Sequence, residues 1–306
     1  MNLAHVHIIL NHVPSLGSIA GLLLLAWGIY KKDEAVKQFA YGVLVLITMA
    51  VLPTYITGAE AQLIVNKSPT YAPGMVQLHQ NAAMITLLCM TAAGMFAWFG
   101  LWEIRRHARS SSLTTMATLI FTMAAVAAVL VTASIGGKIS HQEIRDASDL
   151  TITEAVGWRP QIEMWINDHA WSWPTLEMIH YVGMAFLFGV STVYLFRMIG
   201  IMKGISLKAL HRLLPMAIIG FVINTITGMI FFAGAPQLYL GKVGFQIKIL
   251  GIVVTTIPIL YFTMFNEPWK VQADENPPAT AKIAAVATFV LVVVVMIYGR
   301  FLPWVN

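Results

Sequence analysis

The sequence predicts an all-α, polytopic membrane protein with eight transmembrane helices in two four-helix bundles and both termini outside. Lys, Arg, Asp and Glu make up only 11% of the 306 residues, against about 25% in soluble domains. The mean hydropathy is +0.73. Eight long stretches contain no charged residue, and each approaches or exceeds the roughly 20 apolar residues that a helix needs to cross a bilayer.

The charge-free stretches divide the chain into elements and domains. The first bundle occupies residues 1–137 and the second occupies residues 175–306. Residues 138–174 form a polar loop between them, in which residues 158–171 are expected to form a short helix on the bilayer surface. The eight predicted spanning helices lie near residues 8–30, 37–57, 76–102, 113–136, 175–199, 209–233, 245–266 and 280–300.

The loops carry an asymmetric basic charge that predicts the orientation. Twelve Lys and Arg residues follow the first, third, fifth and seventh helices, against seven on the opposite side, so the former loops are expected to be cytoplasmic. Both termini and the polar loop then lie outside, where Trp165, Trp171 and Trp173 suit an interfacial belt. The twelve residues are Lys31, Lys32, Lys37, Arg105, Arg106, Arg109, Arg197, Lys203, Lys208, Arg212, Lys270 and Lys282.

The composition excludes several classes of function. The pI near 9.3 follows from the basic cytoplasmic loops, and no basic run interleaved with aromatic residues indicates nucleic-acid binding. Cys89 is the only cysteine and lies in mid-helix, so a disulfide, a c-type haem attachment and a cysteine zinc site are excluded. The seventeen methionines are scattered through apolar helices, which favours packing over copper binding.

The histidines are the best indication of function. Seven of the nine fall on the predicted outer side, and imidazoles at one depth of a helix bundle are a common way to hold haem or metal. His107 and His211 lie on the cytoplasmic side beside Arg106 and Arg212 and are expected to be solvated. The seven outer-side histidines are His5, His7, His12, His79, His141, His169 and His180.

In the first bundle, the pattern favours His12 and His79 as ligands of one b-type haem. His5 and His12 are seven residues apart, about 700° of rotation, so they share one helix face while His7 points elsewhere. His79 opens the third helix, which runs parallel to the first and places it at the same depth. The alternative for each residue is an interfacial or hydrogen-bonded histidine with no ligand.

A stripe of glycines on the first helix has two interpretations. Gly17, Gly21 and Gly28 leave room either for a flat macrocycle or for close contact with another helix. Helix contact is the more common use of such stripes in membranes.

In the second bundle, His180 is the candidate ligand, and it lacks a histidine partner at its depth in the following helices. A bis-histidine site there would need His141 or His169 from the loop. A hydrogen-bonded core histidine is an equally good interpretation. Lys248 either extends its ammonium to the outer interface or, with Lys242 or Lys138, neutralises haem propionates.

Two groups of motifs resemble known families. The first half is similar to uncharacterised bacterial four-helix membrane domains thought to bind b-type haem, although Gln80 stands where many of them carry glutamate. The second half is similar to an uncharacterised family related to the copper-resistance D-type membrane domain, although Asn266 stands where relatives often carry histidine. The motifs are His5-Val-His7-Ile-Ile-Leu-Asn-His12, Pro53-Thr-Tyr55-Ile-Thr-Gly58, Gln77-Leu-His79-Gln, Ile179-His180-Tyr-Val-Gly183, Thr227-Gly228 and Gly244-Phe245-Gln-Ile-Lys248.

We therefore expect a multi-pass subunit of the bacterial inner membrane that binds one haem b, with a second haem as a further option. It would pass electrons between an outer-side cytochrome c or iron–sulfur protein and the quinone pool or another membrane subunit. It would be an electron-transfer subunit of an oxidoreductase complex rather than a self-contained enzyme. The alternatives are a transporter of copper or another metal, with His12, His79 and His180 as metal ligands, and a cofactor-free scaffold of a larger complex.

Overall fold

The computed structural model describes residues 2–67, 73–146, 149 and 158–302. Helices make up 86% of the structure, and its described residues contain no strand. Eight helical segments are long and apolar enough to cross a membrane. The prediction of an all-α fold with eight spanning helices is thereby confirmed, while the outside location of both termini stays a prediction.

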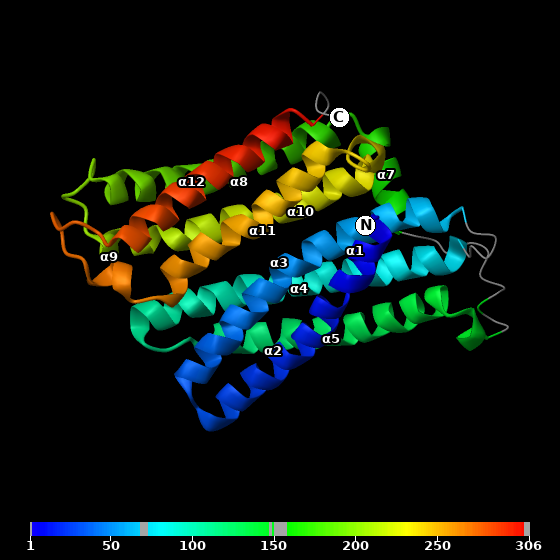
Figure 1. Cartoon of the computed structure of the whole chain (residues 1–306), viewed down its shortest axis with the longest axis horizontal. Coiled ribbons are helices and arrows are strands. Elements are labelled where there is room, and N and C mark those ends of the chain that lie inside the picture. Colours follow the sequence, from blue (N-terminus) through cyan, green and yellow to red (C-terminus); the bar gives the residue numbers. More distant parts are fainter. Residues whose placement is uncertain (1, 68–72, 147–148, 150–157, 303–306) are drawn as a thin grey trace. The chain divides into compact units, whose positions relative to one another are not determined.

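Contacts divide the chain into two compact units (Figure 1). Unit 1 comprises Met1–Ala97 and Ser112–Trp165, and unit 2 comprises Trp98–Ser111 and Ile166–Asn306. This division differs from the sequence-based boundaries at residues 137 and 175 mainly in one respect. The end of the third spanning helix and the turn after it group with unit 2.

Unit 1 is built from four spanning segments, of which the first is interrupted. Pro14 has no backbone N–H for the carbonyl oxygen of Leu10, four residues earlier, and the helix divides at Asn11. The hydroxyl of Thr54 lies 3.5 Å from the released Leu10 oxygen. The helices are α1 (Leu3–Leu10), α2 (His12–Lys31), α3 (Glu34–Val65), α4 (Pro73–His107) and α5 (Ser112–Ser140), followed by the 3₁₀ turn η1 (Gln142–Ile144).

The glycine stripe of α2 packs against α3. A Cβ atom at Gly17 would lie 2.9 Å from the side chain of Ile47, and one at Gly21 would lie 2.6 Å from Leu44. Gly28 makes the same kind of approach to Lys37. Because side-chain atoms already fill the space beside these glycines, the helix-contact interpretation of the stripe is confirmed.

The polar loop contains the expected short helix, α7 (Trp158–Asp168), which ends three residues earlier than predicted. Its amphipathic character is visible in the structure. Ile166 is 5% exposed, whereas Met164 is 56% exposed. Ile166 lies directly against Gly234 of unit 2.

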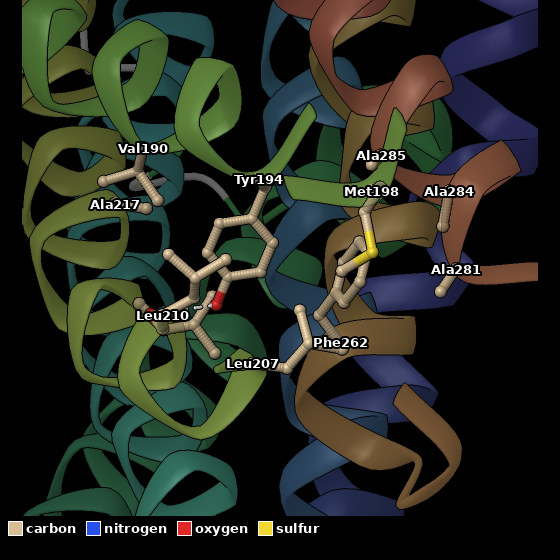
Figure 2. Close-up of a cluster of buried hydrophobic side chains, with 11 residues drawn as sticks. Val190, Tyr194, Met198, Leu207, Leu210, Ala217, Phe262, Ala281, Ala284 and Ala285 are labelled. Atoms are coloured by element: carbon tan, nitrogen blue, oxygen red, sulfur yellow. Dashed lines mark hydrogen bonds between the residues drawn. The ribbon is translucent and has the colours of Figure 1, made fainter. Parts of the chain in front are cut away.

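Unit 2 packs its spanning helices around an apolar core at the predicted cytoplasmic end (Figure 2). Tyr194 is at its centre: its hydroxyl donates to the Leu210 carbonyl oxygen at 3.2 Å, and its ring meets Phe262 edge to face. The elements are α8 (Ser172–Ile199), α9 (Leu207–Leu210), η2 (His211–Leu213), α10 (Leu214–Gly234), η3 (Pro236–Leu238), α11 (Val243–Met264), η4 (Glu267–Lys270) and α12 (Ala279–Arg300).

Candidate functional site

His7 of α1 is held against α3. Its Nδ1 lies 2.9 Å from the carbonyl oxygen of Thr54, and its ring rests on Gly58, where a Cβ would lie 2.8 Å from Cε1. In a helix, the side chain at position i+4 extends back toward the carbonyl of residue i. Gly58 is four residues after Thr54, so the missing side chain leaves the Thr54 oxygen open to the imidazole.

His79 of α4 is held in the same way against α5. Its Nδ1 lies 3.0 Å from the carbonyl oxygen of Thr132, and a Cβ at Gly136 would lie 2.9 Å from its Cε1. Gly136 again follows the accepting threonine by four residues. Two Thr-x-x-x-Gly segments, on α3 and on α5, thus form matching seats for two imidazoles.

The two seats bring the histidines together. The ring centroids of His7 and His79 are 6.4 Å apart, with the ring planes at 88°. A carbonyl oxygen only accepts hydrogen bonds, so each Nδ1 must carry the proton, which leaves a lone pair on each Nε2. Among the described residues neither Nε2 has a hydrogen-bond partner. The site therefore presents two neutral imidazole ligands of the same tautomer.

The residue after His79 ties α4 to α3. The amide of Gln80 donates to the side-chain oxygen of Gln62. Gln80 therefore makes an uncharged contact between α4 and α3. It fixes the α4 turn that carries His79.

The structure places the other predicted ligands of unit 1 away from this pair. His12 is exposed, and its Nδ1 bonds to the Ile8 carbonyl oxygen of the preceding turn. His5 is exposed and bonds to Asn2, the N-cap of α1. The rotation argument placed His5 and His12 on one face of the first helix and His7 on another, and the face that contacts α3 is the one that carries His7. His7 is thus the residue that the sequence analysis missed.

The carboxyl end of α5 holds a charged cluster. The Lys138 ammonium lies 2.9 Å from Asp149 and 3.4 Å from Asp146. Its hydrogen bond holds the pKa of the Asp149 carboxyl below the usual range, with the backbone N–H of Asp146 adding to the effect. Arg145 donates to the Lys138 carbonyl oxygen at 2.7 Å. Lys138, offered above as a propionate partner, is paired with carboxylates.

The loop histidines have partners of their own. His141 bonds to Glu143 at 3.0 Å and is exposed. The Glu143 backbone N–H, and after it the His141 hydrogen bond, lower the pKa of the Glu143 carboxyl. His169 is exposed with its ring against Trp171. Residues 150–157, which a loop folded over His180 would need, lie outside the described residues.

In unit 2, His180 is a hydrogen-bonded interior histidine. Its Nδ1 lies 2.7 Å from the hydroxyl of Thr227, and its ring meets Phe231 edge to face at 5.8 Å. Lys248 of α11 is partly buried near His180. His180 and Lys248, both candidate ligands in the sequence analysis, therefore lie within electrostatic range of each other.

The expectation that His211 is solvated is wrong. The residue is 3% exposed, stacked on Trp102 at 6.0 Å and edge-on to Trp269 at 4.6 Å. Trp102 donates to the His211 carbonyl oxygen at 2.9 Å. Two tryptophans that are distant in sequence cover this imidazole. The expectation of a solvated residue rested on the adjacent Arg212, which does not predict these contacts. His107 is exposed, as expected.

No family model, curated protein or solved structure matches this chain. Its own geometry is therefore the basis for assigning a function. The first criterion is the set of side chains that could coordinate a metal ion. In the part of the chain that the structure describes, no group of three or more His, Cys, Asp or Glu side chains could hold a metal ion.

The residues at the His7–His79 pair fit a haem. A structural or catalytic zinc ion takes three or four protein ligands, whereas haem iron receives four nitrogens from its porphyrin and needs only axial ligands from the protein. His7 and His79, whose ring centroids are 6.4 Å apart, would supply two imidazoles to a haem.

Proposed function

We propose that this chain is a membrane b-type cytochrome subunit in which His7 and His79 would hold one haem. The observation that carries the proposal is the matched pair of seats: each imidazole donates its Nδ1 proton to a threonine carbonyl oxygen and presents a bare Nε2. Histidine ligands of metals almost always make such a second hydrogen bond, because it sets the tautomer and the ring orientation.

Each residue of the site has a distinct role. Thr54 and Thr132 orient the rings through their carbonyl oxygens, and Gly58 and Gly136 allow the rings to lie against the α3 and α5 backbones. When bound, haem supplies a centre that takes up and releases one electron.

The wider function follows from this chemistry. The subunit passes electrons between an outer-side partner, such as a cytochrome c or an iron–sulfur protein, and the quinone pool or another membrane subunit. It belongs to the bacterial inner membrane. His180 is not included as a haem ligand, because the structure brings Phe231, and no second histidine among the described residues, into contact with its ring.

One specific observation favours a second candidate. Two adjacent imidazoles, with ring centroids 6.4 Å apart, could also hold a single two-coordinate Cu⁺ ion, since imidazole is a good copper ligand. Such a site would serve copper capture or transport. It would use the same two histidines without a macrocycle.

Visible spectroscopy of the purified chain tests the proposal. The wild type, expressed in a haem-producing host, should show a reduced b-type α band with about one haem per chain. His7→Ala and His79→Ala should lose it, whereas His12→Ala and His5→Ala should keep it. A colourless wild type that binds one equivalent of Cu⁺ through His7 and His79 would replace the haem proposal with the copper one. A band that survives both substitutions would place haem elsewhere.

A further inference from the structure

Lys248 of α11 is a charged side chain within unit 2 that the proposed haem site does not use. Its ammonium is neither hydrogen-bonded nor ion-paired to any residue that the structure describes. The fully buried side-chain atoms without a partner in the described part of the chain are Arg105 Nε and His211 Nε2, so the Lys248 ammonium keeps some accessible surface. An accessible, unpaired charge in a membrane-spanning helix is costly and commonly marks a binding site.

Gly299 of α12 leaves the space that this ammonium occupies. A Cβ at position 299 would lie 3.1 Å from Lys248 Nζ, and its three nearest atoms would all belong to Lys248. α11 and α12 run antiparallel (Figure 1). One turn deeper in the bundle Gly251 packs on Val295, where a Cβ would lie 2.9 Å from Cγ2. The two contacts form one seam between α11 and α12, and the ammonium lies at its end.

The depth of the ammonium follows from the length of α12. This helix has 22 residues and is about 33 Å long, close to the roughly 30 Å of the hydrocarbon core of a bilayer. Gly299 is its penultimate residue, so the ammonium beside it lies at the edge of the core. Lys248 is the sixth residue of α11, and helical side chains tilt toward the N-terminus, here toward the same edge. Phospholipid headgroups begin at this depth.

The charges at this end of the helix pair select an anion. Lys242 is the N-cap residue of α11, and the exposed Arg300 directly follows Gly299. Neither of these cations forms an ion pair with another described residue. Ammonium and guanidinium groups only donate hydrogen bonds, so their ligand must accept them, and a negative charge strengthens the contact. Basic residues beside the ends of membrane helices are typical of sites for anionic lipid headgroups.

A phosphate group could reach the ammonium on a lipid or as a free ion. The lipid is favoured because the seat lies at the edge of the hydrocarbon core, between two spanning helices. Exposed apolar side chains continue from this level into the membrane: Ile297 of α12 is 48% exposed and Leu250 of α11 is 63% exposed. Acyl chains can lie along such surfaces while the phosphate meets the ammonium.

We infer that Lys248 binds the phosphate of an anionic phospholipid, in a seat that Gly299 leaves open. Arg300 and Lys242 add electrostatic attraction for the headgroup. The inference does not depend on haem binding in unit 1.

Native mass spectrometry of the full chain in detergent tests the inference. Dioleoyl-phosphatidylglycerol and dioleoyl-phosphatidylcholine, which have the same acyl chains, are titrated separately, and the dissociation constant of the first bound lipid is measured. Wild type should bind phosphatidylglycerol about tenfold or more tightly than phosphatidylcholine, the value for a hydrogen bond between charged groups. Lys248→Met should lose most of this preference. Gly299→Leu, which keeps the charge but fills the seat, should lose it as well.

Two matched substitutions control for charge and for side-chain volume. Lys67→Met removes an exposed cation from unit 1. Gly189→Leu adds a side chain where a Cβ would meet nothing within 4 Å. Both variants should keep the preference within about twofold of wild type.

Each other outcome has a definite meaning. Equal affinity of wild type for the two lipids, or a wild-type preference in Lys248→Met, overturns the lipid site. Loss of haem absorbance in Lys248→Met would make Lys248 a partner of haem propionates and also overturn it. Inorganic phosphate that, without lipid, raises the unfolding temperature of wild type but not of Lys248→Met would assign the seat to a free ion instead. A preference that is intact in His7→Ala supports the lipid site whatever the fate of the haem proposal.

Discussion

His7 lies against the backbone of α3 because position 58 is glycine: a Cβ at Gly58 would be 2.8 Å from the imidazole Cε1. The ring cannot move away freely, since its Nδ1 is bonded to the Thr54 carbonyl oxygen. The pair His79 and Gly136 repeats the relationship on α5. These glycines therefore control the orientation of the imidazole rings by leaving room for them, and they contribute no functional group of their own.

Gly58→Ala and Gly136→Ala should each lower haem occupancy or shift the α band while the protein still folds. The added methyl forces the ring off its carbonyl acceptor, because contacts below 3.0 Å cannot be tolerated. The reduced spectrum and the haem-to-protein ratio measure this effect.

Gly189→Ala is the matched control for these substitutions. Its Cβ meets nothing within 4 Å, so the change should leave the spectrum unchanged and stabilise the helix by about 0.5–1 kcal/mol. Equal haem content in all three variants would contradict the role of the two glycine seats.

A second packing relationship holds α3 to α4. The Thr48 hydroxyl donates to the Met90 carbonyl oxygen at 2.8 Å, and a Cβ at Gly94 would lie 2.7 Å from Thr48 Cβ. Gly94→Ala should destabilise the protein by about 1–3 kcal/mol through overpacking. In the double variant with Thr48→Ala, much of this loss should be recovered. Thermal unfolding in detergent measures it, and strictly additive effects would contradict the contact.

Arg197 is fully buried and holds two loops at the predicted cytoplasmic end of unit 2. Its guanidinium donates to the carbonyl oxygens of Ile205 (2.5 Å), Gln272 (3.1 Å) and Glu275 (3.3 Å). Arg197→Met should destabilise by about 3 kcal/mol, because several buried acceptors lose their donors. Faster proteolysis within residues 201–206 and 271–278 should accompany a lower unfolding temperature. A wild-type cleavage rate would argue against this role.

Acidification should release the cluster at the end of α5. The Lys138 hydrogen bond lowers the pKa of Asp149, so its stabilising contribution is complete above the unfolded pKa of about 3.9 and is lost as pH falls through the lower folded pKa. Hydrogen exchange at the Asp146 amide, which donates to Asp149 at 2.8 Å, should accelerate in that range relative to the intrinsic rate. In Lys138→Met the transition should move to higher pH. An unchanged transition would remove Lys138 as the cause.

Orientation is testable by labelling single cysteines in a Cys89→Ala background. The basic loops predict that Ser111→Cys reacts only after the membrane is opened, and that Ser148→Cys, outside the described residues, reacts in intact cells. The reverse pattern would place the His7–His79 pair at the cytoplasmic side, and the electron-transfer partner with it.

Sequence alone determined the fold class, the eight spans and the amphipathic helix in the polar loop, because hydropathy and charge are local properties that the bilayer converts directly into helices. It also pointed to His79, which the structure places beside His7, while the outer-side location of the histidines stays a prediction. The Thr-x-x-x-Gly segments at positions 54–58 and 132–136 are also local sequence features, and they form the seats for His7 and His79. The structure was needed to recognise what these segments do.

Only the tertiary structure decided which side chains meet. The position of His7 rather than His12 against α3 depended on which face of α1 packs on that helix. The burial of His211 depended on two tryptophans from distant segments. Such pairings arise from the packing of helices against one another. The periodicity of a sequence predicts which face of a straight helix is apolar, but it predicts neither the bends of that helix nor which helices lie next to it.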